Sequence, residues 1–153
     1  MKLTDILDEG FIIPDLKAGS KRNVLEELVS VFKLKYPSID TSEFLQVLLE
    51  REKLGSTGIG EGVAIPHGKV KDLDKLIVSF GRSEKGIDFN ATDSQAVNLF
   101  FLLIAPESST GSHLKALAQI SRLLKDEKTR ESLKKAETRE EIYRIISEND
   151  RDY

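Results

Sequence analysis

The chain has 153 residues, 39% of them hydrophobic, so it is long enough for one domain with a buried core and too short for two ordinary domains. Its formal net charge is only -3 although 32% of its residues are charged, which provides no one-sided field for nucleic acid or an anionic membrane. It has no cysteine and two histidines, which excludes disulfides and thiolate sites and predicts neither a metal nor another cofactor.

The N-terminal residues MKLTDILDEGF contain acidic side chains almost at once and lack the basic start and apolar run of a signal peptide. No apolar stretch approaches the length that spans a membrane. We therefore expect a single cytoplasmic domain over residues 1–153, without direct membrane insertion.

The first half of the chain predicts two amphipathic helices. Apolar residues at helical spacing indicate the first over residues 20–36, which a proline closes. The second begins near Asp40, with Glu43 three residues later as in a capping box, and ends at Gly55. Arg51 therefore lies in its last turns.

The middle of the chain predicts a central sheet. Glycines interrupt residues 55–62, which we expect to form a loop leading into a short strand at 63–65. Runs rich in branched and aromatic residues follow at 76–82 and 97–105, with a shorter strand and a turn expected between them at 86–94. The nearly continuous apolarity of the last run predicts an interior strand with helices on both faces, so the fold class is α/β.

The C-terminal part predicts three further helices. The first has Ser112 as its expected cap, which places His113 in its first turn. One more begins after Asp126, and the last is capped by Thr138 with Glu141 three residues on.

His67 is the strongest candidate for chemistry, because it follows a strand and Pro66. Gly68 is expected to leave room beside the ring for another molecule. Imidazole, with an ordinary pKa of about 6.5, is a nucleophile near neutral pH and forms covalent intermediates. The alternative is that His67 caps the strand end and hydrogen-bonds a carbonyl.

The glycine-rich segment before His67 is a second candidate feature, since such a loop can aim backbone N–H groups at an anion. Ser56 and Thr57 either hydrogen-bond a phosphate or satisfy a turn. The spacing matches neither the nucleotide P-loop nor the dinucleotide fingerprint, and the P-loop lysine is missing, which argues against a nucleotide-binding domain.

His113 and Arg51 complete the set of candidates. Free N–H groups and the positive end of the dipole gather at a helix start, where His113 is placed to hydrogen-bond a phosphoryl oxygen. Its alternative is an exposed first-turn residue. Arg51 provides a positive charge for phosphate, or belongs with Glu50 and Glu52 to a solvated helix face.

The family resemblance rests on two segments, LGSTGIGEGVAIPHGK around His67 and SHLKALAQISRLLKD around His113. They resemble enzyme IIA of the bacterial phosphoenolpyruvate-dependent phosphotransferase system, fructose/mannitol class, and look closest to its nitrogen-regulatory branch. The resemblance implies a mixed, partly parallel β-sheet sandwiched between helices. It also implies phosphorylation of His67, at Nε2, by the phosphocarrier protein HPr or its nitrogen-branch relative. His113 assists, and Arg51 matches a family position near the phosphohistidine.

The resemblance leaves two roles open, both of which use His67. In the first, the chain is a regulatory protein whose phosphorylation state controls the binding of target proteins. In the second, it is a phosphotransferase component that passes the phosphoryl group to a cysteine of a IIB protein in sugar uptake. Because this chain has no cysteine, that IIB must be a separate protein.

Overall fold

The computed structural model of the chain describes residues 1–109 and 111–150. Its helices are α1 (Lys21–Ser30), α2 (Thr41–Lys53), α3 (Gly111–Lys125), α4 (Glu127–Lys135) and α5 (Arg139–Asn149), with short 3-10 turns η1 (Leu3–Asp5), η2 (Glu9–Phe11) and η3 (Val31–Leu34). Its strands are β1 (Ile12–Ile13), β2 (Gly58–Gly60), β3 (Val63–Ala64), β4 (His67–Val70), β5 (Ile77–Ile87) and β6 (Val97–Pro106).

The strands form one mixed sheet in which β6 is central. On one side β6 pairs with β5 in antiparallel fashion, and β1 then adds to β5 in parallel. On its other side β6 pairs in parallel with two short strands in succession, first β3 and then β4. β2 pairs with β3 in antiparallel fashion and forms the far edge.

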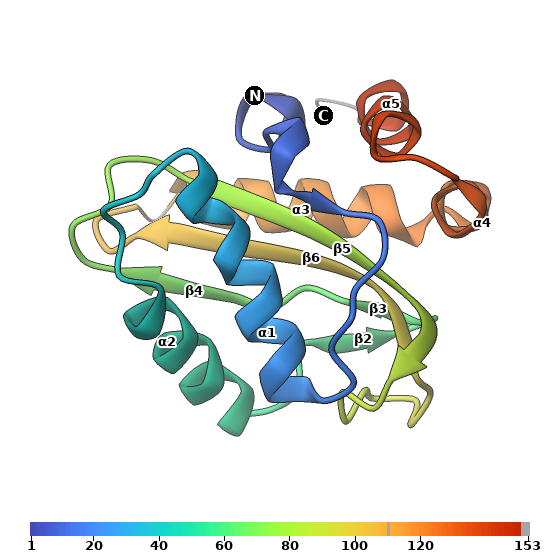
Figure 1. Ribbon diagram of the computed structural model, residues 1–153, viewed down its shortest axis with the longest axis horizontal. Coiled ribbons are helices and arrows are strands. Elements are labelled where there is room, and N and C mark those ends of the chain that lie inside the picture. The colour runs from blue at the N-terminus through green and yellow to red at the C-terminus, as the bar shows by residue number, and fades with distance from the viewer. Residues whose placement is uncertain (110, 151–153) are drawn as a thin grey trace.

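Helices cover both faces of this sheet. Figure 1 shows α1 crossing in front of the sheet and α3 running behind it. α2 packs against α1 and against β4, so it flanks the edge of the sheet where the short strands lie. α4 and α5 follow α3 toward the N-terminal turns, with α5 next to β1. The predicted mixed sheet between helices is confirmed.

β6 is the interior strand that its apolarity predicts. Every residue from Leu99 to Ala105 is fully buried, and β6 has strand partners on both edges, β5 on one and β3 followed by β4 on the other. Such a strand has apolar contacts on both faces, which is why its sequence lacks the usual polar alternation.

Three of the predicted helix starts are confirmed by side-chain caps. The carboxylate of Asp40 accepts a hydrogen bond from the amide of Glu43 at 3.1 Å, and Thr138 caps α5 in the same way through Glu141. Asp126 caps α4. These oxygens satisfy amide groups that the first helical turn leaves unpaired.

Two local predictions are wrong. The strand expected within residues 86–94 does not form beyond Ile87, where β5 ends. The chain turns instead, with positive φ at Asn90 and Ser94, while Phe89 is fully buried under the turn. Ser112 is not a cap, because α3 already begins at Gly111. Residue 110, which precedes it, lies outside the described residues.

Candidate functional site

His67 is the first residue of β4, so the sheet itself fixes its backbone. The carbonyl of Pro66 accepts a hydrogen bond from the amide of Leu103 on β6 at 2.9 Å. His67 is then paired in register with the same Leu103. The sequence places this histidine after a strand; in the structure it opens one, on a frame attached to the central strand.

The imidazole of His67 is oriented by a backbone carbonyl two residues earlier. Its Nδ1 lies 2.8 Å from the carbonyl oxygen of Ile65. A carbonyl oxygen only accepts hydrogen bonds, so Nδ1 carries the proton in the neutral ring and Nε2 keeps its lone pair. The half-buried ring thus presents one defined nucleophilic nitrogen.

His113 lies beside His67, as the shared-site hypothesis requires. The two ring centroids are 5.7 Å apart and the ring planes are inclined by 54°. His113 is in the first turn of α3 and only 7% exposed, so the alternative of a solvent-exposed residue is wrong. Its buried Nδ1 has no hydrogen-bond partner among the described residues.

The surroundings favour the neutral form of both histidines. Burial lowers the pKa of His67 below its ordinary value; the hydrogen bond to Ile65 opposes this shift, and the positive charge of Arg51 adds to it. Burial also lowers the pKa of His113, and the charges of His67 and Lys69 act in the same direction. Each ring is therefore unprotonated, and available as a nucleophile or a neutral donor, at neutral pH.

Arg51 lies at the C-terminal end of α2, close enough for its charge to act on His67. Its guanidinium donates a hydrogen bond to the carbonyl of Gly55 at 2.9 Å, which satisfies a backbone acceptor just beyond the helix. One such bond leaves further N–H groups of the guanidinium for an anion. The structure thus brings Arg51 to the site.

Ser56 and Thr57 use their hydroxyl groups within the loop. Ser56 donates to the carbonyl of Phe89 at 2.6 Å and accepts from the amide of Gly58 at 3.0 Å. The hydroxyl of Thr57 donates to the carboxylate of Glu52, which also accepts from the Thr57 amide at 3.1 Å. In this arrangement both hydroxyl hydrogens hold the loop, and phosphate binding by these residues stays a prediction.

Gly68 does not provide the open space that its sequence position suggests. A Cβ at residue 68 would lie 2.5 Å from Cγ1 of Val47 on α2, far closer than any real contact. The missing side chain therefore lets α2 approach β4. Val47 and Arg51 are four residues apart on α2 and share one helix face, so this contact also sets how close Arg51 comes to the histidines.

Two parts of the site were missed from the sequence. The Ile65 carbonyl is a backbone group, and no residue type signals its role. Glu52 enters the sequence analysis only as part of the solvated face that is the alternative for Arg51, yet it is 8% exposed and forms an ion pair with Lys21 at 2.9 Å. Its position four residues after Leu48, on the apolar face of α2, is the signal that identifies it.

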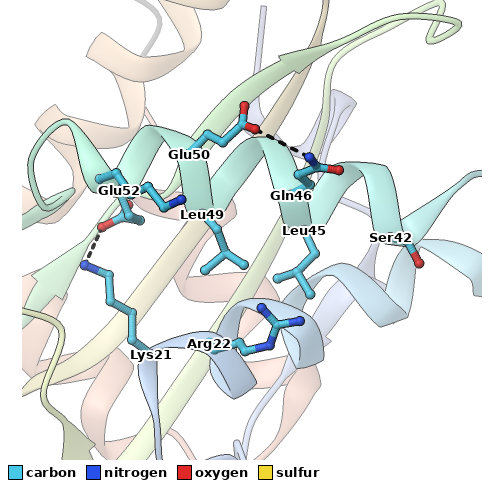
Figure 2. A pocket seen from close by; sticks show the side chains of 9 residues that line it. Lys21, Arg22, Ser42, Leu45, Gln46, Leu49, Glu50 and Glu52 are labelled. Atoms are coloured by element: carbon cyan, nitrogen blue, oxygen red, sulfur yellow. Dashed lines mark hydrogen bonds and ion pairs between the residues drawn. The ribbon is translucent and has the colours of Figure 1, made fainter.

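A large surface cavity lies between α1 and α2. It has a volume of about 710 Å³ and is lined by both apolar and charged side chains. Figure 2 shows Leu45 and Leu49 on α2 facing Arg22 on α1, with the ion pair between Lys21 and Glu52 at one end. The cavity thus reaches the buried carboxylate that holds the loop.

The described residues offer neither a metal site nor a membrane-spanning helix. Among residues 1–109 and 111–150 no group of three or more histidine, aspartate or glutamate side chains is arranged to hold a metal ion. In the same part of the chain, no helix combines the length and apolarity needed to cross a bilayer.

Comparison with known proteins identifies the family. Residues 5–149 match the family described as "Phosphoenolpyruvate-dependent sugar phosphotransferase system, EIIA 2". The chain is 42% identical over 147 residues to a nitrogen regulatory protein of Bradyrhizobium diazoefficiens, covering 96% of this chain and 95% of that protein. It is 37% identical over 151 residues to the fructose-specific EIIABC component of Bacillus subtilis, covering 99% of this chain and 24% of that longer protein.

A solved structure agrees with the sequence matches. The crystal structure of nitrogen regulatory protein IIA-Ntr from Neisseria meningitidis superposes with a TM-score of 0.88 at 35% identity, covering 94% of this chain and 98% of that one. The two-histidine site, the mixed sheet and the sequence match agree: the chain belongs to the EIIA type 2 family of the phosphoenolpyruvate-dependent phosphotransferase system.

Proposed function

We propose that the chain is a phosphocarrier that accepts a phosphoryl group on Nε2 of His67. The observation that carries this proposal is the bond between Nδ1 and the Ile65 carbonyl at 2.8 Å, since it leaves Nε2 as the nucleophile. The donor is a phosphohistidine of HPr or its nitrogen-branch relative. As the new N–P bond forms on His67, the N–P bond to the donor histidine breaks.

His113 and Arg51 stabilise the phosphoryl group in transit. His113 lies in the first turn of α3, where helix N–H groups and the helix dipole favour negative charge. Arg51 adds a fixed positive charge from α2. The protein takes little part in the bond-making itself, so it accelerates the transfer mainly by positioning the groups and stabilising their charge. A rigid site serves both purposes.

Two exposed leucines beside the site support docking of a protein donor. Leu54, which directly follows α2, is 85% exposed, and Leu114, which follows His113, is 66% exposed. Apolar side chains next to a reactive group are the kind of surface that a protein partner covers. HPr, or a relative with the same phosphohistidine, is the proposed partner.

The phosphorylation state is proposed to regulate the binding of target proteins in a nitrogen-regulatory role. This is supported by relatives named nitrogen regulatory protein that match this chain over 95% of their own length. Phosphorylation adds about two negative charges at the site, enough to attract or repel a partner surface. We propose further that residues 1–153 act as one cytoplasmic domain.

The second candidate is a relay in sugar uptake, favoured by the 37% identity to a fructose-specific component. In that role the phosphoryl group passes from His67 to a cysteine of a separate IIB protein. The two roles differ in one measurable property. Rapid transfer from the phosphorylated chain to a purified IIB protein supports the relay, and equal binding of a target to both forms contradicts the switch.

The test is incubation with phosphoenolpyruvate, enzyme I and HPr, followed by intact-mass measurement of wild type and His67→Ala. A gain of one phosphoryl group that acid removes, and that the variant lacks, supports the proposal. Normal labelling of His67→Ala contradicts it. If wild type gains nothing from HPr, the nitrogen-branch carrier is used as donor, and a second failure rejects the phosphocarrier role.

A further inference from the structure

A continuous series of polar contacts connects α1 to the imidazole of His67. Lys21 forms an ion pair with Glu52 at 2.9 Å, and Glu52 accepts hydrogen bonds from the amide and hydroxyl of Thr57. The carbonyl of Thr57 accepts from the amide of Ile65 at 3.0 Å. The carbonyl of the same residue, which lies in the next peptide unit, accepts from Nδ1 of His67.

Glu52 is the unusual member of this series. It lies on the apolar face of α2 and is 8% exposed, in a position that an uncharged side chain would fill at lower desolvation cost. Its carboxylate is compensated by Lys21 and by the two Thr57 donors, all within hydrogen-bond or ion-pair distance. A buried charge compensated in this way fixes the geometry of the groups around it.

The geometry being fixed is that of residue Ile65. Its amide donates to the Thr57 carbonyl, so the loop that carries this threonine sets the position of residue 65 and thereby, across one rotatable bond, constrains its carbonyl. This carbonyl in turn decides which ring nitrogen of His67 carries the proton. A loop that moved would leave the ring free to exchange tautomers and to place the proton on the nucleophilic nitrogen.

We propose that Glu52 is a positioning residue for the phosphoryl acceptor. Acting through Thr57 and the backbone of Ile65, it holds the His67 ring in the tautomer that leaves Nε2 unprotonated. The inference rests on the proposed phosphocarrier function for its consequence, but the tautomer is a property of the unphosphorylated protein and is measured separately.

The fold provides a reason to expect that this contact can be removed without unfolding the strand. The Pro66 carbonyl is held independently by Leu103 of β6 at 2.9 Å, and β4 continues in register beyond it. Loss of the Glu52 contacts therefore releases the side chain and amide of Thr57, and loosens its hold on Ile65, while the sheet remains paired.

The experiment compares Glu52→Gln with Glu50→Gln. Both substitutions remove one negative charge from α2 next to the same cavity. Glu50, however, is exposed, and its carboxylate accepts a hydrogen bond from Gln46 at 3.5 Å (Figure 2). Imidazole ¹⁵N NMR spectra above pH 7.5 report the proton position in each protein. We expect wild type and Glu50→Gln to show the proton on Nδ1, and Glu52→Gln to show a mixture of tautomers.

The phosphorylation rate is the second readout. We expect Glu52→Gln to accept phosphate at least about tenfold more slowly, with Glu50→Gln at the wild-type rate. A wild-type tautomer in folded Glu52→Gln overturns the inference. If Glu52→Gln does not fold, Thr57→Val takes its place, since this substitution removes only the hydroxyl that bonds to Glu52. An unchanged His67 tautomer in Thr57→Val also overturns the inference. If the tautomer shifts but wild type accepts no phosphate, the positioning role stands and the phosphocarrier function fails.

Discussion

The imidazole rings of His67 and His113 lie next to each other, with centroids 5.7 Å apart. His67 is carried by β4 and His113 by the first turn of α3, elements that are separated by two long strands in the chain. Their meeting depends on the parallel pairing of β4 with β6, because α3 begins soon after β6 ends. The topology, and not sequence proximity, assembles the pair.

The first prediction follows from this arrangement. His113→Ala keeps the nucleophile, so His67 should still be phosphorylated, but about 100-fold more slowly because one stabilising donor is lost. Rapid-quench measurement of phosphoryl transfer from HPr gives the rate. Ser121→Ala, farther along the same helix, is the control and should match wild type. A wild-type rate in His113→Ala removes His113 from the mechanism.

The lowered pKa of His67 and His113 gives a prediction about pH. The unfolded chain binds more protons than the folded one between the folded pKa values and about 6.5, the ordinary value. The free energy of unfolding should therefore be highest above about pH 6.5 and fall as the pH drops below it. Urea titrations from pH 7.5 to pH 5 measure this slope, and the double variant His67→Asn/His113→Asn should reduce it.

Protonation also bears on the chemistry. Since a protonated imidazole is not a nucleophile, phosphorylation should remain fast at pH 6.5 and decline only at lower pH, as the folded-state pKa of His67 is approached. Proton NMR titration of the two rings gives the values directly. A His67 that titrates above pH 6.5 contradicts the effect assigned to burial.

Gly68→Ala tests the close contact between β4 and α2. The new methyl group overlaps Val47, so we expect destabilisation of about 1–3 kcal/mol. Adding Val47→Ala to this variant should recover part of the loss, although Val47→Ala alone destabilises. Urea unfolding of the four proteins forms a double-mutant cycle, and purely additive effects contradict the contact.

Arg51→Met should slow phosphorylation at least about tenfold, since the charge near the phosphoryl group is lost. It should change the free energy of unfolding by only about 1 kcal/mol, the typical contribution of one hydrogen bond such as that to Gly55. Arg51→Lys restores the charge but not the planar set of donors, and an intermediate rate is expected. Equal rates in all three proteins exclude Arg51 from the site.

Ser56→Ala separates the two roles considered for that residue. If the hydroxyl serves the loop through Phe89 and Gly58, the variant loses about 1 kcal/mol of stability and keeps its phosphorylation rate at saturating donor. Thermal unfolding and the rate assay measure both. A large loss of rate with unchanged stability instead supports direct contact with phosphate.

The sequence predicted those parts of the fold that local rules determine. Side-chain caps such as Asp40 and Thr138, and the continuous apolarity of β6, identified helix starts and the interior strand because the physical cause lies within a few residues. Strands β2 and β4 were missed because they are short. β2 contains two glycines and is extended by pairing with the neighbouring β3, and β4 is extended by pairing with β6, which lies much later in the chain. The strand expected within residues 86–94 was wrong, since Phe89 is buried although it lies beyond the end of β5.

The candidate site shows the same division. His67 and His113 are identifiable by residue type, and the structure brings them together. Their partners depend on tertiary contacts: the Ile65 carbonyl has no sequence signature, and Glu52 resembles any charged residue of a surface helix until its place on the apolar face of α2 is considered. Gly68 was expected to leave room for another molecule, but Val47 of α2, which lies earlier in the chain, occupies that space.

The attachment of β4 to β6 determines how fast the site can rearrange. The Leu103 amide on the buried part of β6 donates to the Pro66 carbonyl before β4, and the amide of Glu107, just after β6, donates to the Val70 carbonyl at the end of β4. The segment is therefore attached at both ends. Its backbone can open only when the sheet opens, on the timescale at which core amides exchange with deuterium. Fast adjustment to successive partners must then come from side chains around the histidines, while the acceptor backbone keeps one shape through every encounter.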